Sequence, residues 1–211
     1  MTSINKLKPF ICTNSIFKET RPELFTIAES ENYFIASDGV RAGVIFKSED
    51  TSLNDKFTNN FNSVQQCIKE IRNNSEYSIT INRKELLDNL KASWKVFKQN
   101  YTNLNNNITI HKDETLVILE MDTDNHELSY SVVAKNKMIN MGANAIFKNV
   151  NYSKEHEYFK IGFSLKFFEE HLEFFSGNQQ IDIRYKLNKF SPIITEIGDR
   201  LAILLPYRLN N

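Results

Sequence analysis

A repeated pattern of apolar residues is the feature that most limits the folds open to this chain. Residues 77–99 predict a strand followed by an amphipathic helix, and residues 158–175 predict the same pair. When "ITINRKELLDNL" is aligned with "IGFSLKFFEEHL", the apolar residues occupy corresponding positions. Repetition of a supersecondary unit carries more weight than any prediction made for a single segment. We therefore expect a fold built from two copies of one block.

Three strands are expected after each predicted helix, which makes each block β-α-β-β-β. The expected strands are 107–113, 115–122 and 127–134 in the first copy, and 180–187, 191–198 and 201–206 in the second. Strands and helices in these proportions predict the α+β class.

The first 75 residues predict a shorter unit. Strands are expected at 23–29, 32–37 and 40–46, with an Asp38-Gly39 turn before the last of them. A polar connector covers 47–60, and a helix at 63–71 places Val64, Cys67, Ile68 and Ile71 on one face. The three strands look like the end of a third block. We expect a partial domain at 1–75 and a complete one at 76–211.

Composition excludes several classes of protein. The chain has 211 residues, with 26 basic and 26 acidic side chains, so a protein that coats nucleic acid over its whole surface is not expected, although a local basic stripe is allowed. Cys12 and Cys67 stand alone, which argues against a zinc site and a disulfide framework. Neither a signal-peptide core nor a run of membrane-spanning length is recognisable. We expect a cytoplasmic protein that does not bind membranes.

Two sets of motifs resemble the bacterial sliding clamp, the β subunit of DNA polymerase III. Residues 76–209 resemble its C-terminal domain: "ILLPYRL" (203–209) is similar to the family's Pro-x-Arg-Leu ending, and "SPIITE" (191–196) to its Ser-Pro strand. "ASDGVRA" (36–42) is similar to the Ala-Thr-Asp-Gly-x-Arg-Leu signature of the clamp's middle domain. The resemblance implies the DNA-clamp fold, with antiparallel sheets outside and helices on one face.

The same resemblance implies a hydrophobic groove for partner peptides. Carried over by position, its walls are Leu24, Ser37, Gly39, Arg41 and Ala42 on one side and Ile203, Leu205, Pro206, Tyr207, Arg208 and Leu209 on the other. Apolar anchors of a peptide need an apolar slot, and Arg41 or Arg208 could hold a carbonyl or carboxylate at the rim. The alternative is that 201–206 is an ordinary core strand and 207–209 trails off.

A lysine stripe follows from the residues themselves. On a helix at 83–98, a single face is expected to carry Lys84, Lys91, Lys95 and Lys98. Such a stripe can neutralise phosphates without reading bases, and in the clamp family such helices line the central channel. The alternative is a solvated surface face. The last helix departs from the pattern, because Glu169, Glu170 and Glu173 would repel DNA.

Residues suited to catalysis or metal binding are few. "DTDNHE" (122–127) offers metal ligands, but it lies between two expected strands and lacks the glycine and the distal glutamate of a calcium loop, so a hairpin turn is favoured. His111, His156 and His171 share no metal-ligand spacing. No phosphate loop or nucleophile motif is recognisable. We expect no enzymatic activity, no cofactor and no metal.

Two functional hypotheses follow. In the first, the protein is a shortened sliding clamp, a processivity factor that tethers DNA polymerase, clamp loader or repair proteins to duplex DNA through the groove. Closure of a homo-oligomeric ring would then need further copies of the chain or a host partner, or would not occur. In the second, it is a monomeric clamp-like decoy that sequesters clamp-binding peptides or the loader without encircling DNA. The acidic last helix favours the second.

Overall fold

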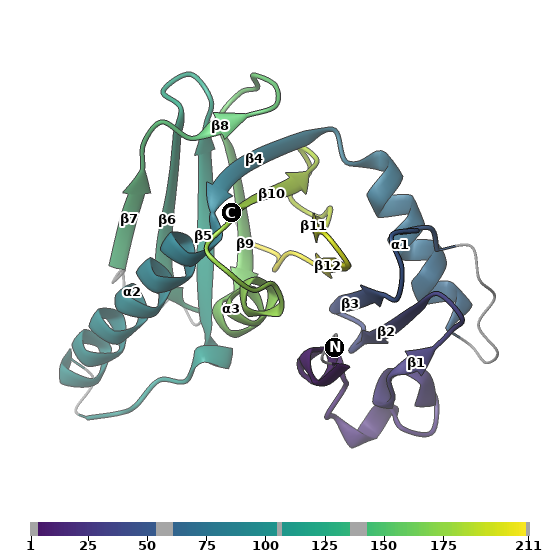
Figure 1. Ribbon diagram of the computed structural model, residues 1–211. Helices are drawn as coiled ribbons and strands as arrows, with labels where there is room; N and C mark the ends of the chain where they lie inside the picture. The colour runs from purple at the N-terminus through teal and green to yellow at the C-terminus, as the bar shows by residue number, and fades with distance from the viewer. Residues whose placement is uncertain (1–3, 54–60, 105–106, 136–142, 210–211) are drawn as a thin grey trace.

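Two antiparallel sheets dominate the computed structural model, which describes residues 4–53, 61–104, 107–135 and 143–209 (Figure 1). The larger sheet has eight strands, in the order β1 (Ala28–Glu29), β2 (Tyr33–Ser37), β3 (Arg41–Phe46), β12 (Arg200–Leu204), β11 (Ile193–Ile197), β10 (Gln180–Tyr185), β4 (Tyr77–Asn82) and β8 (Asn151–Tyr152). The smaller has four, in the order β7 (Ala143–Phe147), β6 (Glu127–Ala134), β5 (Thr115–Asp122) and β9 (Phe159–Ser164).

Three α-helices accompany the sheets in the described residues: α1 (Asn62–Asn74), α2 (Arg83–Leu104) and α3 (Leu165–Phe174). Short 3₁₀ segments are η1 (Ile4–Phe10), η2 (Ser15–Phe17), η3 (Pro22–Phe25) and η4 (Lys112–Glu114). In Figure 1, α2 and α3 lie beside the two sheets of the duplicated part, whereas α1 lies against the strands β1–β3.

The expected duplication is confirmed. Each block is one strand, one helix and three strands: β4-α2-β5-β6-β7 and β9-α3-β10-β11-β12. The blocks exchange their first strands, because β4 pairs with β10 of the second block and β9 pairs with β5 of the first. Neither block can therefore complete its own sheet without the other. The protein has the expected α+β fold with antiparallel sheets.

The main core lies between the sheets and the helices of the two blocks. Leu86, Leu90 and Phe97 of α2 and Phe168 and Leu172 of α3 are buried in it. Apolar residues repeat every three or four positions along both helices, so each helix turns one face inward.

The sheet around β3 and β12 is covered on both faces. Side chains alternate between the faces of a strand. Ile35, Val44 and Ile203 pack with Ile68 of α1, while their neighbours Ala36, Ile45 and Ala202 pack with Phe10 of η1 and Phe174 of α3. Residues 4–46 and the strand β12 are thus joined in one packed unit.

Three expectations about elements are wrong. Residues 107–113 form no strand: η4 begins at Lys112, and Ile110 is buried from an irregular segment. The third strand of the first block is instead β7, in a stretch for which no element was expected. Residues 23–29 hold only the two-residue β1, because Pro22 starts a 3₁₀ turn. Part of the expected connector, 54–60, lies outside the described residues.

Candidate functional site

The turn between β2 and β3 is fixed by its own polar side chains. Gly39 has a φ of +87°, a left-handed conformation that glycine adopts without strain. The Ser37 hydroxyl donates to the Arg41 carbonyl at 2.8 Å and accepts from the Gly39 amide at 3.1 Å. Asp38 accepts from the amides of Val40 and Arg41. The strand that begins at Arg41 therefore leaves the turn in a defined direction.

This turn and the last strand border a hollow of about 190 Å³, which we call the groove. Six of the residues predicted for a peptide site line it: Ser37, Gly39, Arg41, Ala42, Ile203 and Leu205. The strands meet directly, since Ala42 pairs with Ile203 and the Leu205 amide donates to the Val40 carbonyl at 2.9 Å. Leu24 is buried under Gly39 and is not among the lining residues.

Helix α1 supplies a wall of the groove that the sequence analysis did not assign to a site. Val64, Cys67, Ile68 and Ile71 line the hollow opposite the strands. Burial, with a smaller effect of Glu70, raises the pKa of the Cys67 thiol, so this wall stays uncharged at neutral pH. The spacing of these residues had predicted an apolar face, but periodicity does not say which surface that face meets.

Arg41 lines the groove, but its guanidinium is already occupied by other groups of the chain, which corrects the role expected for it. Its guanidinium pairs with Asp38 at 2.8 Å and with Glu170 of α3, and it donates to the Pro9 carbonyl. It also lies 4.1 Å from the centre of the Phe167 ring. With 4% of the side chain exposed, Arg41 joins η1, β3 and α3 and cannot reach a peptide carboxylate.

The chain turns away from the groove at Pro206, which is a second correction. The Tyr207 amide donates to the Gly162 carbonyl of β9 at 2.7 Å, and Leu209 packs against Gly162. Tyr207, Arg208 and Leu209 line a different recess, on the four-stranded sheet. Proline has no amide hydrogen with which to continue the pairing, and Pro206 follows the end of β12. The predicted far wall of the groove is therefore divided between two places.

The lysine stripe has the expected position on α2. Lys84, Lys95 and Lys98 are exposed. Lys91 differs, because its ammonium pairs with Glu173 of α3 at 2.6 Å. Nearby, the buried Arg83 donates to the carbonyls of Leu172 and Gly177 and holds the end of α3 against the start of α2.

The three glutamates of α3 are each paired with a cation from another element, which the charge pattern of the helix alone did not predict. Glu169 pairs with Lys112, Glu170 with Arg41, and Glu173 with Lys91. The Glu173–Lys91 pair stays partly exposed, with 47% of the Glu173 side chain accessible. The exposed Lys166 lies on the same helix.

Inside α3, burial, with a smaller effect of Arg41, lowers the pKa of His171 to about 3. The ring is fully buried, and its Nε2 lies 3.0 Å from the Thr195 hydroxyl. His171 is therefore neutral at physiological pH and belongs to the core.

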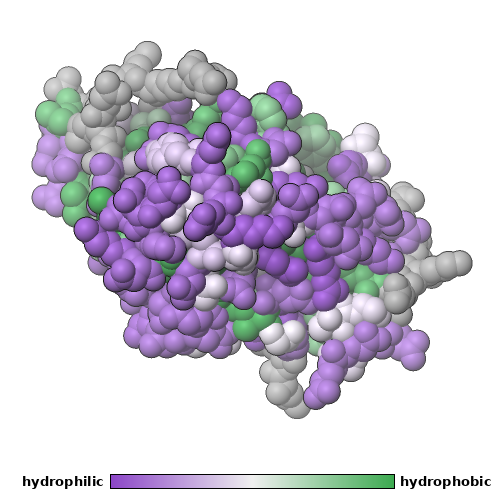
Figure 2. All heavy atoms as spheres, turned by 90° about the horizontal axis from the view of Figure 1, so that it is seen from above, coloured by the Kyte–Doolittle hydropathy of each residue, from purple (hydrophilic) through white to green (hydrophobic). Residues whose placement is uncertain are grey.

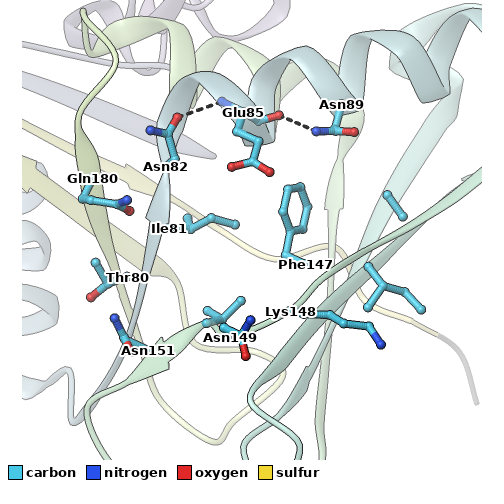
Figure 3. Close-up of a pocket in the computed structure, with 13 residues that line it drawn as sticks. Thr80, Ile81, Asn82, Glu85, Asn89, Phe147, Lys148, Asn149, Asn151 and Gln180 are labelled. Atoms are coloured by element: carbon cyan, nitrogen blue, oxygen red, sulfur yellow. Dashed lines mark hydrogen bonds between the residues drawn. The ribbon is translucent and has the colours of Figure 1, made fainter.

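A polar cleft of about 580 Å³ separates the start of α2 from the β7–β8 connection (Figure 3). Amide side chains surround it: Asn82, Asn89, Asn149, Asn151 and Gln180. Asn82 accepts from the Glu85 amide and Asn89 donates to the Glu85 carbonyl, while the Glu85 carboxylate points into the cleft. None of the predicted site residues lines this cleft.

Three further observations concern one surface of the protein, the turn at 122–127, and possible metal or membrane sites. The face seen in Figure 2 is covered mainly by hydrophilic residues. In the stretch 122–127, Asp122 and Glu127 pair across the β5–β6 hairpin, as the turn hypothesis predicted. Within the described ranges no group of three or more potential ligands is arranged for a metal ion, and no helix is long and apolar enough to cross a membrane.

Comparison with known proteins gives a match in structure but not in sequence. No protein-family model and no curated protein sequence matches the chain. Solved β sliding clamps do match. The clamp of Caulobacter crescentus is 13% identical with a TM-score of 0.68, covering 98% of this chain and 62% of that one. DNA polymerase III subunit β of Pseudomonas aeruginosa is 11% identical with a TM-score of 0.65, covering 97% and 63%.

The β subunit of Borrelia burgdorferi is 13% identical with a TM-score of 0.66, covering 98% of this chain and 60% of its own length. The chain thus spans about three-fifths of the clamps that it matches. Nearly all of it is superimposable on them, as the resemblance of its motifs implied. This protein has the fold of the bacterial sliding clamps, the β subunits of DNA polymerase III.

Proposed function

We propose that this protein is a clamp-like, non-enzymatic tether that holds a replication or repair protein on duplex DNA. The partner supplies a short peptide whose apolar side chain enters the groove. The observation that carries the proposal is the groove itself, an apolar hollow at the junction of the Asp-Gly-x-Arg strand and the last strand of a clamp fold.

The groove is smaller than the ~300–1,000 Å³ of typical small-molecule sites, and its size suits a single side chain. Its volume is about 190 Å³, and a cavity of ~150 Å³ accommodates one benzene ring. Val40 and Leu205, at 40% and 36% exposure, flank it. A leucine or phenylalanine of a partner would bury these side chains together with Val64 and Ile71 of α1.

Helix α2 supports the DNA-binding part of the proposal. Lys84, Lys95 and Lys98 present flexible cations, which suit contact with phosphates irrespective of sequence. The pairing of the glutamates on α3 removes the main electrostatic objection to a neighbouring DNA backbone.

A peptide-binding measurement tests the groove. A fluorescent peptide that carries a clamp-binding motif is titrated with the protein and followed by anisotropy. We expect the double variant Val64→Ala/Leu205→Ala to bind at least tenfold more weakly, because two apolar walls are truncated.

Tyr207→Ala is the matched control, since Tyr207 lies on the same tail but contacts β9. Its affinity for the peptide should stay within twofold of wild type. Unchanged binding by the double variant, or an equal loss in Tyr207→Ala, would remove the groove assignment.

The decoy hypothesis stays as a second candidate, and one observation favours it. Lys91 pairs with Glu173, so only three of the four lysines of the stripe are left to contact DNA. A decoy would bind the peptide, remain monomeric at micromolar concentration and show no affinity for duplex DNA. Sedimentation velocity with and without a 30-base-pair duplex separates the two functions.

A further inference from the structure

A recess on the four-stranded sheet has no part in the proposed function. Its volume is about 670 Å³, and Leu116, Ile118 and Val133 form its floor. Leu116 and Ile118 alternate along β5 with Val117 and Leu119 of the main core, so they lie on the opposite face of the sheet. We call this hollow the tail recess, because residues 207–209 form one of its walls.

The wall is held firmly. The Tyr207 amide donates to the Gly162 carbonyl, which adds a bridge to the edge of β9. A Cβ placed on Gly162 would lie 2.7 Å from Leu209 Cδ2, so the absence of a side chain at this position lets the tail approach. The tail recess is therefore part of the fold and not a gap beside a loose end.

Basic residues surround the apolar floor. Among the described lining residues four are basic, Lys135, Lys160, Lys189 and Arg208, and none is acidic. In a chain of zero net charge this is a marked local excess.

Two of these cations face groups that do not cancel their charge. Lys135 donates to the Asp113 carbonyl and lies 5.3 Å from the centre of the Tyr207 ring. The guanidinium of Arg208 lies 5.6 Å from the centre of the Phe190 ring. Lys160 pairs with the carboxylate of Glu120 at 2.7 Å. Lys135 and Arg208 therefore give the rim a positive charge that an anionic partner can neutralise.

We propose that the tail recess binds an acidic protein segment, which places apolar side chains on the floor and carboxylates against the rim. Nucleic acid would satisfy the cations, but its phosphates would leave the floor of Leu116, Ile118 and Val133 without an apolar partner. A segment that alternates acidic and apolar residues satisfies both.

The groove and the tail recess share no lining residue. Leu205 belongs to the first and Tyr207 to the second, on either side of Pro206. One molecule can therefore hold two protein segments at once, through adjacent stretches of the same tail. This inference does not depend on what occupies the groove.

The test uses a fluorescein-labelled peptide, Glu-Leu-Asp-Phe-Glu-Leu, and the full chain. We expect the peptide to bind wild type, and Lys135→Glu/Arg208→Glu to weaken binding at least tenfold. Lys18→Glu/Lys166→Glu, which changes the net charge equally at exposed positions outside the recess, should change the affinity less than twofold. A peptide with lysines in place of its acidic residues should not bind.

Isoleucine methyl NMR locates the peptide. The methyl signal of Ile118 should move on titration, while that of Ile203, in the groove, should not. No binding to wild type, or a shift at Ile203 alone, overturns the proposal. The proposal also fails if the peptide does not bind but a twelve-nucleotide oligo-dT does, and if the oligo-dT affinity falls in the Lys135→Glu/Arg208→Glu variant. Thermal melts of both double variants show whether lost binding reflects lost folding.

Discussion

Helices α2 and α3 occupy equivalent places in the two blocks but carry charge in different ways. Lys84, Lys95 and Lys98 of α2 extend into solvent, whereas each glutamate of α3 contacts a cation from another part of the chain. The pattern of charges along a helix therefore predicts its surface potential only where neighbouring elements supply no counter-charge. The predictions below test this difference, from the largest expected effect to the smallest.

Replacing Arg41 with methionine should have the largest effect. It leaves Asp38 and Glu170 without their shared cation, and loss of one partner from a buried pair costs about 3–5 kcal/mol. The free energy of unfolding, measured by urea denaturation, should fall by about that amount. Lys166→Met on the exposed side of α3 is the control, with a change within about 0.5 kcal/mol. Equal small effects would show that Glu170 needs no partner.

Acid should weaken α3 through His171. The unfolded chain binds a proton at His171 near pH 6.5, but the folded protein does so only near pH 3. This contribution to stability is therefore complete above pH 6.5 and is lost as the pH falls, at up to about 1.4 kcal/mol per pH unit. When the pH falls from 7 to 5, the free energy of unfolding of His171→Asn should decrease by about 2 kcal/mol less than that of wild type. His126→Asn, at an exposed turn, should follow wild type.

Reversing two charges on α2 should weaken DNA binding. For Lys95→Glu/Lys98→Glu we expect about a tenfold loss of affinity for a duplex at low salt, and a salt dependence lower by about 2 in slope. Anisotropy at several salt concentrations measures both. Lys148→Glu/Lys154→Glu, on the β7–β9 side, serves as the matched variant. The lysines of α2 are merely solvated if both variants bind equally.

The smallest effect is expected when a glutamate of α3 is neutralised. Glu173→Gln frees Lys91 for a phosphate, so affinity for the duplex should rise about twofold to threefold. Stability should change by less than about 1 kcal/mol, because the pair is exposed. Weaker DNA binding by this variant would mean that Glu173 positions Lys91 rather than competing for it.

Much of the fold could be predicted from the sequence, because the two blocks repeat the same periodicities and each is long enough to show them. The prediction failed where local signals were weak. Ile108 and Ile110 alternate as in a strand but follow the end of α2. The strand β7 has only five residues, and its adjacent apolar Ala145, Ile146 and Phe147 show no clear alternation. Exchange of β4 and β9 between the blocks could not be read from either block alone, since pairing partners are set by the tertiary fold.

The candidate site could be predicted only in part. The motif around Gly39 and the strand at Ile203 indicated where two chain segments meet. Two further features could not be predicted, because each depends on contacts between residues far apart in the sequence. One is the wall that α1 forms, and the other is the ion pair between Arg41 and Glu170. Tyr207 leaves the groove because it pairs with Gly162 at the edge of β9. Nothing in the sequence around Gly162 indicates that the tail would pair there.

The central position of β12 has a consequence for synthesis. This strand lies between β3 and β11, yet Arg41 and its partner Leu204 are far apart in the sequence. The ribosome makes β3 before β12, so one edge of β3 stays unpaired while the residues between the two strands are synthesised. Unfilled borders of this kind recruit foreign strands. During this interval the nascent chain should depend most on chaperones, until β12 pairs with β3 and covers the exposed edge.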